Sequence, residues 1–512
     1  MNLSIRTAQA AQRHGDRIAI VEGDRHWTYR EFDTQVDRVA SALAARFEPG
    51  ARIGVMMSNC AEAVMLQFAL ERASLVRVAV NFRYTGLELR TLMTHSEASA
   101  VFFDPSCAAT VRAAGLPSVM QLVEAGEDQA GWLEWCNHVV TADRLHRATP
   151  DTLATLNYTS GTTGAPKGVM LTHANCSAVY RNMLVDRDLR GDDVVAYVGP
   201  LTHSSGAYLA PWFWRGARNL IVTAPTPARL VDAIEQERVT AFTCVPTFLT
   251  KLVALPDVEQ RDLRSLRLIG YGAEPLPVNT LERAWSLFGP VLWQNYGQTE
   301  AMMTCTHLPP QDHLRIDDDG RTGLRHGSIG LPYTFVEVVL RDAHGQAVPA
   351  GEVGELTVRA DHVMQGYWRQ PDATAAALRD GWLWTGDLAV ADEDGMLRLV
   401  GRRKDMLICG GFNIYPGEIE SLLTGLPGVL EAAVVARADP DWGEIAVGFV
   451  VLAPGSDQDA AALAGALKPM LGIKTPKAWH VVETLPKNAN GKIDKRELMR
   501  RDALGRNQEA LN

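Results

Sequence analysis

Between residues 18 and 400, short β-branched segments alternate with stretches of helical pattern, and this alternation constrains the fold more than any other feature of the chain. The segment 52–57 is typical of a strand, 61–72 of a helix rich in Ala, Glu and Leu, and 74–80 of another strand. The same order recurs between 265 and 295. Strands that alternate with helices indicate parallel pairing through crossover helices, so we expect an α/β fold.

The pattern changes near residue 400. Before it, 351–358 and 395–400 are typical of hairpin strands, which predicts a small β-barrel-like subdomain beside the parallel and mixed sheets. After it we expect a compact α+β unit, with a helix that starts at Pro416. The further elements expected in this unit are strands within 432–436, 447–452 and 479–482 and a helix within 458–471. We therefore predict a composite N-terminal domain of residues 1–401, a hinge at 402–404, and a small mobile C-terminal domain of residues 405–512.

Length and charge exclude several classes of protein. A chain of 512 residues with 46% apolar residues is too long for one small module and too apolar for a disordered protein. Its net charge of -10 excludes nucleic acid as the main partner. The seven cysteines contain no C-x-x-C pair, which excludes a zinc site or disulfide framework of the usual spacing. No signal peptide or membrane-spanning segment is evident, so we expect a cytoplasmic protein.

The segment 158–168 is the most informative motif. It reads Tyr-Thr-Ser-Gly-Thr-Thr-Gly-Ala-Pro-Lys-Gly and follows a strand-like stretch. Hydroxyl groups, glycine backbone N–H groups and one lysine are what a polyphosphate requires. The Walker A pattern does not fit, because Pro166 stands where its second glycine should be and Gly168 stands where its hydroxyl should be.

Four further segments carry polar residues in patterns suited to a nucleotide. The segment 295–300 places an aromatic residue, a glycine, a hydroxyl and a carboxylate at the end of a strand, where a base can stack and Mg²⁺ can bind. The segment 384–387 puts one carboxylate after a tight turn, which suits the hydroxyl pair of a ribose. The other two are the glycine-rich run 401–420 and the basic segment 486–493.

These five segments, in this order and at these spacings, resemble the adenylate-forming superfamily. That superfamily contains acyl- and aryl-CoA synthetases, the adenylation domains of nonribosomal peptide synthetases, and beetle luciferases. The resemblance covers almost the whole chain. It implies that ATP and Mg²⁺ convert a carboxylic acid into an acyl-adenylate with release of pyrophosphate, and that the acyl group then passes to CoA as a thioester.

The resemblance assigns the ATP site residue by residue. It implies that the β- and γ-phosphates are held by Thr159, Ser160, Gly161, Thr162, Thr163 and Lys167. It implies that Gly272, Ala273 and Glu274 line the edge of the adenine and that Tyr296 flanks it. Asn295 and Gly297 are also assigned to the ATP site, and Gly272 and Asn295 are expected to approach the acyl group as well. Thr299 would touch the α-phosphate, Glu300 would bind Mg²⁺, and Asp387 with Arg402 would hold the ribose hydroxyls.

Four residues of the C-terminal part receive roles from the same resemblance. Lys492 is similar to the lysine that bridges the attacking carboxylate and the α-phosphate, where its charge offsets the repulsion between two anions. Lys404 stands at the position of the hinge residue. Rotation about it would remove Lys492 after adenylation and bring Gly410 and Gly411 to the path of the thiol, since one site cannot hold both groups.

The resemblance also predicts the acyl pocket. His203 would orient the carboxylate, and Ser204 stands where amino-acid-activating relatives usually have an aspartate, which argues against an α-amino acid. The remaining residues expected at the acid are Ser205, Tyr271, Met302 and Met303. These small and soft side chains suit a ring or a medium aliphatic acid.

The sequence leaves two matters open. An amide-forming ligase, in which an amino acid or another amine captures the adenylate, shares every adenylation motif and is the alternative to CoA transfer. An enzyme that loads a separate carrier protein is a third hypothesis, because the chain has no carrier motif of its own. Monomer and homodimer are equally compatible with the sequence.

Overall fold

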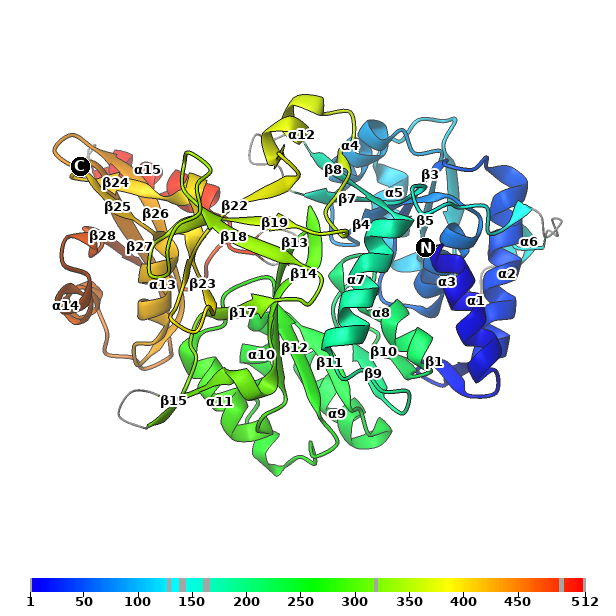
Figure 1. Cartoon of the computed structure of the whole chain (residues 1–512), viewed down its shortest axis with the longest axis horizontal. Helices are drawn as coiled ribbons and strands as arrows, with labels where there is room; N and C mark the ends of the chain where they lie inside the picture. Colours follow the sequence, from blue (N-terminus) through cyan, green and yellow to red (C-terminus); the bar gives the residue numbers. More distant parts are fainter. Residues whose placement is uncertain are drawn as a thin grey trace.

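The computed structural model describes residues 2–126, 130–137, 144–159, 166–316, 321–487 and 492–509. These residues form two large sheets, with helices between and outside them, and a smaller α+β unit at the C-terminal end (Figure 1). This arrangement confirms the predicted fold class, a large N-terminal α/β part with a small C-terminal part.

The first sheet contains seven strands in the order β20-β8-β7-β4-β3-β5-β6. Its strands β3 to β7 pair in parallel, while β8 and β20 add antiparallel strands at one edge. The bounds are β3 (Arg52–Met56), β4 (Val76–Val80), β5 (Ala100–Phe103), β6 (Gln121–Glu124), β7 (Leu153–Thr159), β8 (Lys167–Thr172) and β20 (Gly366–Tyr367).

The second sheet contains fourteen strands, of which β1 and β9 to β13 pair in parallel. The antiparallel strands β18, β19, β22 and β23 continue it through β17, so the small β-subdomain joins this sheet edge to edge. The bounds are β1 (Ile18–Glu22), β2 (Arg25–Thr28), β9 (Val194–Tyr197), β10 (Arg218–Ile221), β11 (Ala241–Cys244), β12 (Leu268–Gly272), β13 (Leu292–Gln298), β14 (Ala301–Leu308), β17 (Ser328–Pro332), β18 (Glu337–Arg341), β19 (Gly354–Arg359), β21 (Leu378–Arg379), β22 (Trp382–Ala391) and β23 (Leu397–Arg402). A separate hairpin is formed by β15 (Leu314–Ile316) and β16 (Thr322–Leu324).

The helices α1, α3, α7 and α8 pack together and share one hydrophobic core with both sheets. Helices α4 and α5 cover the other face of the first sheet, and α9 to α11 cover the other face of the second. The bounds are α1 (Leu3–His14), α2 (Tyr29–Arg46), α3 (Ala61–Arg72), α4 (Gly86–Ser96), α5 (Ala108–Ala113), α6 (Ala130–Trp135), α7 (His173–Asp186), α8 (Ser204–Arg215), α9 (Pro227–Glu237), α10 (Pro246–Val253), α11 (Val278–Phe288) and α12 (Pro371–Ala377). None of the helices in the described ranges combines the length and the apolar character that a lipid bilayer requires.

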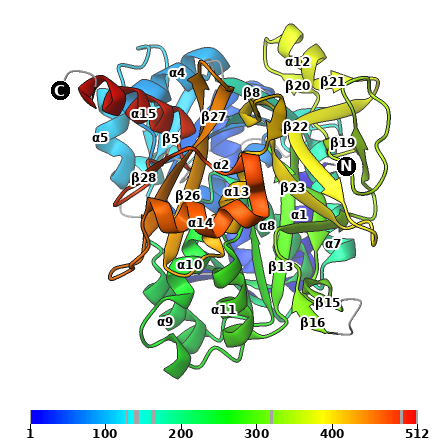
Figure 2. The same cartoon turned by 90° about the vertical axis from the view of Figure 1, so that its left-hand side faces the viewer.

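The C-terminal unit has its own sheet and its own hydrophobic cores. In Figure 2 this unit faces the viewer. Ile419 and Leu463 pack one face of the sheet through α13 and α14, and Leu498 of α15 packs the other. The bounds are β24 (Leu407–Cys409), β25 (Phe412–Ile414), α13 (Pro416–Thr424), β26 (Val429–Asp439), β27 (Gly443–Leu452), α14 (Ala460–Leu471), β28 (Ala478–Val481) and α15 (Lys495–Glu509). Each element that the sequence predicts here is present within a few residues of its expected bounds.

Candidate active site

Asp387 on β22 is buried and pairs across the sheet with Arg402 on β23. The Arg402 Nε lies 3.0 Å from one carboxylate oxygen, and the Tyr296 hydroxyl donates to the other at 2.7 Å. Burial and the negative charge of Asp387 raise the pKa of Tyr296 well above its ordinary value, so the phenol keeps the proton that it donates. The structure thus joins three predicted site residues from distant parts of the sequence in one polar cluster.

Glu300 follows the half-buried Thr299 in the turn between β13 and β14, and it is 9% exposed. Its Oε1 accepts a hydrogen bond of 2.7 Å from the Tyr367 hydroxyl. The Nζ of Lys167 lies 4.8 Å from the centre of the Tyr367 ring, within the range of a cation–π contact. Tyr367 therefore links the carboxylate expected at Mg²⁺ to the lysine expected at phosphate. The sequence analysis missed it, because a tyrosine on a two-residue strand carries no motif.

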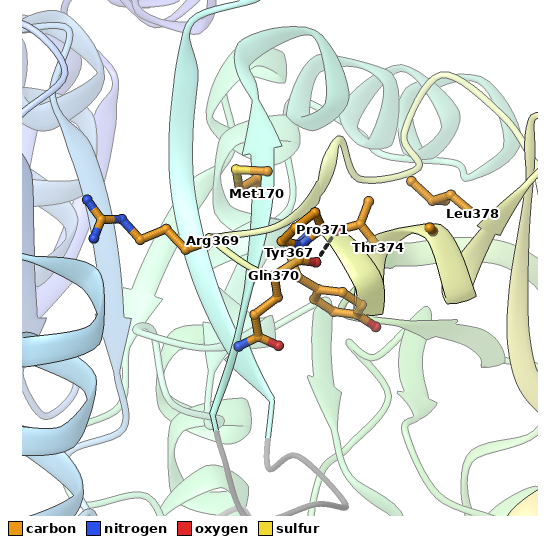
Figure 3. Close-up of a pocket in the computed structure, with 8 residues that line it drawn as sticks. Met170, Tyr367, Arg369, Gln370, Pro371, Thr374 and Leu378 are labelled. Atoms are coloured by element: carbon orange, nitrogen blue, oxygen red, sulfur yellow. Dashed lines mark hydrogen bonds between the residues drawn. The ribbon is translucent and has the colours of Figure 1, made fainter.

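Tyr367 also forms part of the wall of a cavity of about 430 Å³ next to α12 (Figure 3). In this view the side chains of Tyr367 and Gln370 both extend away from Met170. Gln370 donates to the Pro166 carbonyl at 2.9 Å, just before Lys167. The polar side of this wall therefore holds the start of β8 in place.

The phosphate loop is placed by the hairpin that flanks it. Thr159 ends β7, Lys167 starts β8, and the two residues are partners in the antiparallel pair. The other predicted members of the loop, Ser160, Gly161, Thr162 and Thr163, lie outside the described residues. The hairpin sets the two ends of this segment side by side, and Lys167 lies against Tyr367.

The ends of β12 and β13 require glycine at Gly272 and Gly297. A Cβ added at Gly272 would lie 2.3 Å from the Asn295 carbonyl oxygen, and one at Gly297 would lie 2.6 Å from the Met303 backbone, so only glycine fits at either position. Ala273 has a φ of +72°, a left-handed conformation that costs a non-glycine residue about 1 kcal/mol or more. Half-buried Glu274 follows. This strained backbone lies where the sequence predicts the adenine.

Lys492 reaches solvent, yet enough protein surrounds it that desolvation lowers its pKa below the ordinary value. The positive charge of Arg402 lowers this pKa further, while Glu274, Asp387 and Glu300 raise it. In the other direction, the charge of Lys492 lowers the pKa of His203 and offsets the effect of burial on Glu274. The C-terminal unit therefore holds Lys492 within electrostatic range of the predicted ATP and acid sites.

His203 directly precedes α8 and reaches solvent on one side. Desolvation, with smaller contributions from Lys492 and Arg77, lowers the pKa of His203 to about 4. The imidazole is therefore neutral at physiological pH and can donate one hydrogen bond and accept another. Ser205 is buried two residues further along the chain, and the side chain of Ser204 lies outside the described part of the structure.

Two methionines stand near the start of β14, directly after the turn that carries Glu300. Met302 and Met303 are half-buried, and the Asn157 amide lies 4.0 Å from the Met302 sulfur. Met303 has a φ of +63°, in the left-handed region. The turn that carries Thr299 and Glu300 therefore continues directly into the two side chains expected at the acid.

Tyr271 does not line the acyl pocket as predicted. Successive residues of β12 point to opposite faces, and Tyr271 packs in the core under α10 and α11, where its hydroxyl lies 3.0 Å from the His313 Nε2. Gly270 and Gly272 instead point to the face that carries Trp293 and Asn295. The correction follows from the alternation of side chains along a strand. The sequence shows this alternation but does not show which set of side chains faces the site.

Asn295 lies on the predicted face, but its side chain is already engaged. The amide oxygen accepts a hydrogen bond from the buried Arg187 guanidinium and another from the Tyr333 hydroxyl at 2.7 Å. The amide nitrogen donates to the Tyr208 hydroxyl at 3.3 Å. Three neighbours therefore hold the side chain in place, and the contact of Asn295 with ATP stays a prediction. The sequence gives no signal for Arg187, which stands in a charged run that resembles a solvated surface.

The residues expected to act in the second step lie at the surface. Lys404 is exposed in the 3₁₀ turn Arg403–Asp405 between β23 and β24, and desolvation, the largest influence, lowers its pKa. Gly410 and Gly411 form the tip of the β24–β25 hairpin with φ of +57° and +85°. A Cβ at Gly410 would lie 2.8 Å from the Trp442 ring, whereas nothing lies within 4 Å of one at Gly411.

Comparison with known proteins agrees with this geometry. The chain matches the family model of AMP-binding enzymes over residues 7–368 and that of the AMP-binding enzyme C-terminal domain over residues 418–492. It is 38% identical to the feruloyl-CoA synthase of an Amycolatopsis species over 487 residues, which cover 94% of this chain and 95% of the relative.

Two solved structures are similar over almost the whole chain. The amide bond synthetase McbA from Marinactinospora thermotolerans has a TM-score of 0.87 at 28% identity, with 97% of this chain and 99% of that chain covered. ATP-bound MatB from Rhodopseudomonas palustris has a TM-score of 0.88 at 30% identity, with 98% of each chain covered.

Proposed function

This chain belongs to the family of AMP-binding enzymes and is an AMP-forming acid–CoA ligase, and from that premise we propose that its acid is an aryl acid of the hydroxycinnamic type. The observation that carries this proposal is the aromatic and methionine-rich core next to the residues expected at the acid. Tyr208 and Trp293 belong to the same hydrophobic core against which Met302 and Met303 pack. The similarity to a feruloyl-CoA synthase along almost the whole chain supports the same class of acid.

The reaction consists of two displacements. In the first, a carboxylate oxygen of the acid attacks the α-phosphorus of ATP, the bond to pyrophosphate breaks, and an acyl-adenylate forms. In the second, the sulfur of the CoA thiolate attacks the acyl carbon, and AMP leaves. Both displacements bring negatively charged groups together, so the protein must supply fixed cations and oriented donors.

We propose that Asp387 and Arg402 bind the ribose, with Tyr296 against the adenine. The hydrogen bond from Tyr296 and the ion pair with Arg402 fix both oxygens of the buried carboxylate before ATP arrives, which supports this role. Gly272, Ala273 and Glu274 are proposed to line the adenine edge. Thr159 and Lys167 would hold the phosphates together with the hydroxyl residues of the loop between them.

We propose that Glu300 binds Mg²⁺ together with oxygens of the ATP phosphates. In the described ranges no group of three or more His, Cys, Asp or Glu side chains could hold a metal ion alone. A single buried carboxylate fits Mg²⁺, which takes one or two protein carboxylates and completes its shell with phosphate and water. When bound, the ion would neutralise charge that develops on the departing pyrophosphate. Tyr367 orients the carboxylate through its 2.7 Å hydrogen bond.

We propose that Lys492 acts in the first displacement and that His203 and Thr299 orient the reacting groups. A lysine within the electrostatic range of His203, Glu274 and Glu300 can contact both the acid and the α-phosphate. A neutral His203 can donate to the carboxylate without adding a second charge. Ser204 and Ser205 would complete the mouth of the acyl pocket.

We propose that the chain is divided at residues 402–404 and that Lys404 is the hinge of a rotating lid, residues 405–512. The separate sheet and cores after Leu407 support this division. Rotation would exchange Lys492 for the glycine tip at Gly410 and Gly411, where the thiol would pass. Lys404→Pro tests the hinge, because proline restricts φ and should block the second displacement while adenylation continues.

CoA is the acceptor that the family and its relatives support, and we propose that the reaction takes place in the cytoplasm, which supplies ATP and CoA. An amine acceptor is the second candidate, because the fold is similar to that of an amide bond synthetase over 97% of the chain.

A panel of acids and acceptors tests this proposal. The acids are 4-hydroxycinnamate, cinnamate, benzoate and octanoate, each supplied with ATP and Mg²⁺, and the readouts are pyrophosphate release and product mass. We expect fastest release from the cinnamic acids and a thioester with CoA. If octanoate is turned over faster than every aryl acid, the proposed class of acid is wrong. If an amide forms in preference to a thioester, the acceptor is an amine.

A further inference from the structure

A cluster of buried side chains at the acyl side of β13 contains a cation without a carboxylate partner. Arg187 directly follows α7 and is 2% exposed. Its Nε and Nη2 donate to the Tyr333 hydroxyl at 3.1 and 2.9 Å, and Nη2 also donates to the Asn295 side chain. We call Arg187, Asn295, Tyr333 and Tyr208 the Arg187 cluster.

Aromatic rings surround this guanidinium where an acid would be expected. Its central carbon lies 5.0 Å from the centre of the Tyr208 ring and 5.6 Å from that of Trp293. Throughout the described ranges, no carboxylate lies within 4.0 Å of it, and the neighbouring Asp186 bonds instead to Thr334 at the surface. A buried charge without a counter-ion is costly to maintain, so its presence calls for a function.

The cluster has more hydrogen-bond donors than acceptors. Arg187 Nη1 and Trp293 Nε1 are buried, and neither has a hydrogen-bond partner among the residues that the structure describes. The Tyr208 hydroxyl accepts from Asn295, while its own proton has no acceptor in the same part of the chain. Each buried donor without a partner costs about 1–3 kcal/mol. Three such donors at or beside one arginine indicate a binding site for an oxygen atom that accepts hydrogen bonds.

The cluster adjoins the strand and the helix where the acid is expected. Asn295 is the register partner of Gly272 in the parallel pair of β12 and β13. Tyr208 is on α8, the helix that His203 directly precedes, and its ring centre lies 5.0 Å from the central carbon of the Arg187 guanidinium. An acid whose carboxylate lies at His203 and whose body follows α8 would bring its remote end to Tyr208 and Arg187.

We propose that the Arg187 cluster binds an acceptor oxygen that the acid carries at the end remote from its activated carboxylate. This inference rests on the proposed function, because it places the acid in the pocket along α8. A ring hydroxyl, and equally a second carboxylate, supplies such an oxygen. Arg187 Nη1 and the Tyr208 hydroxyl donate to it, and the two aromatic faces hold the ring.

The test compares acids that differ only at the remote position. The kcat/KM for CoA thioester formation by the full chain is measured with 4-hydroxycinnamate, 4-carboxycinnamate and cinnamate. We expect the wild type to prefer one of the two oxygen-bearing acids over cinnamate by about 10- to 100-fold. Which of the two is preferred identifies the source of the oxygen.

Two variants assign that preference to the cluster. Arg187→Met removes the charge at similar length, and we expect it to abolish the preference, because the kcat/KM for the oxygen-bearing acid falls more than that for cinnamate. Tyr208→Phe keeps the ring and removes one donor, and we expect it to reduce the preference about three- to tenfold. The matched control is Arg181→Met, on the same helix but paired with Asp361 at the surface, which should leave the preference unchanged.

Three results would overturn the inference. One is a wild type that shows no preference for an oxygen-bearing acid. The second is a Tyr208→Phe variant whose kcat/KM falls equally with all acids, because the cluster would then have only a structural role. If Arg187→Met does not fold, Tyr208→Phe alone decides between the two roles. If no acid releases pyrophosphate, the proposed function fails by itself. Calorimetric binding of 4-hydroxycinnamate, 4-carboxycinnamate and cinnamate then tests the cluster, and equal affinity for all three is the third result.

Discussion

The N-terminal sheets and the C-terminal unit hold their site residues in opposite ways. In the sheets, Asp387 and Glu300 are buried, and each accepts a 2.7 Å hydrogen bond from a buried tyrosine. In the C-terminal unit, Gly410 lies at an exposed hairpin tip and Lys492 is exposed. The carboxylates are fixed before any ligand binds, whereas the residues of the C-terminal unit can leave their positions without unburying a core.

This difference predicts how the two half-reactions depend on each part. Under the proposed function, a fixed group in the sheets serves both displacements, because ATP and AMP would occupy the same proposed site. An exposed group on a lid serves only the displacement for which it is present. Variants of the sheets should therefore impair both half-reactions, and variants of the C-terminal unit only one.

The largest expected effect is that of Lys492→Ala. Because this lysine carries the charge proposed to lie between two anions, we expect acid-dependent pyrophosphate release to fall about 10²–10³-fold. Thioester formation from supplied acyl-adenylate should stay near the wild-type rate. Lys468→Ala, an exposed lysine on α14, is the matched control. If both half-reactions slow equally, Lys492 does not act in the first displacement alone. The proposed difference between the sheets and the C-terminal unit would then be wrong.

Asp387→Asn tests the same comparison from the sheets. The amide keeps the shape of the side chain but loses the negative charge that pairs with Arg402 and accepts from Tyr296. We expect the KM for ATP to rise about 10- to 100-fold and thioester formation from acyl-adenylate to fall by a similar factor. The control is Asp394→Asn on the exposed turn after β22. A variant that slowed only one half-reaction would contradict the idea of a shared, fixed ribose site.

Gly410→Ala and Gly411→Ala form a matched pair on the C-terminal unit. Both residues have positive φ, so each alanine costs about 1–2 kcal/mol of local strain. Only the methyl group at Gly410 would press against Trp442, at 2.8 Å. We expect Gly410→Ala to slow thioester formation about tenfold, Gly411→Ala to slow it less, and adenylation to continue in both. Single-turnover measurement of each step checks this, and slower adenylation in either variant would show that the tip acts earlier.

The smallest effect per residue concerns acid stability. Burial lowers the pKa of His173, His313 and His362 to about 4, and all three lie in the N-terminal part. In the unfolded chain these groups have a pKa near 6.5, so their contribution to stability is complete above that pH and is lost as the pH falls toward 4. Between pH 7.5 and 5.5 we expect a loss of about 1 kcal/mol per histidine.

Hydrogen exchange on the full chain at the two pH values resolves where this loss occurs. After correction for intrinsic exchange rates, protection of the sheets should fall more than that of the C-terminal unit. In its described part this unit has one histidine, His480, which lies 3.0 Å from Asp502. An equal loss in both parts would show that the acid sensitivity does not come from these buried rings.

The sequence predicted most of the fold. Period-two and helical patterns located the elements within a few residues, as for the helix expected at 61–72 and found at Ala61–Arg72. Motifs singled out Asp387 and Glu300, which the structure buries, and their roles at the nucleotide stay predictions. The prediction that Tyr271 lines the acyl pocket was wrong, because alternation along a strand does not show which of its faces lies toward the site.

What the sequence by itself determined is the family, the class of reaction and the order of strands and helices, since these depend on local pattern and on motifs with fixed spacing. What only the tertiary structure decided is which residues support the motifs. Tyr367 meets Glu300 across 67 positions, and Arg187 meets Asn295 across 108. Such contacts depend on how two sheets and their helices pack, and neither partner carries a local signal of the other.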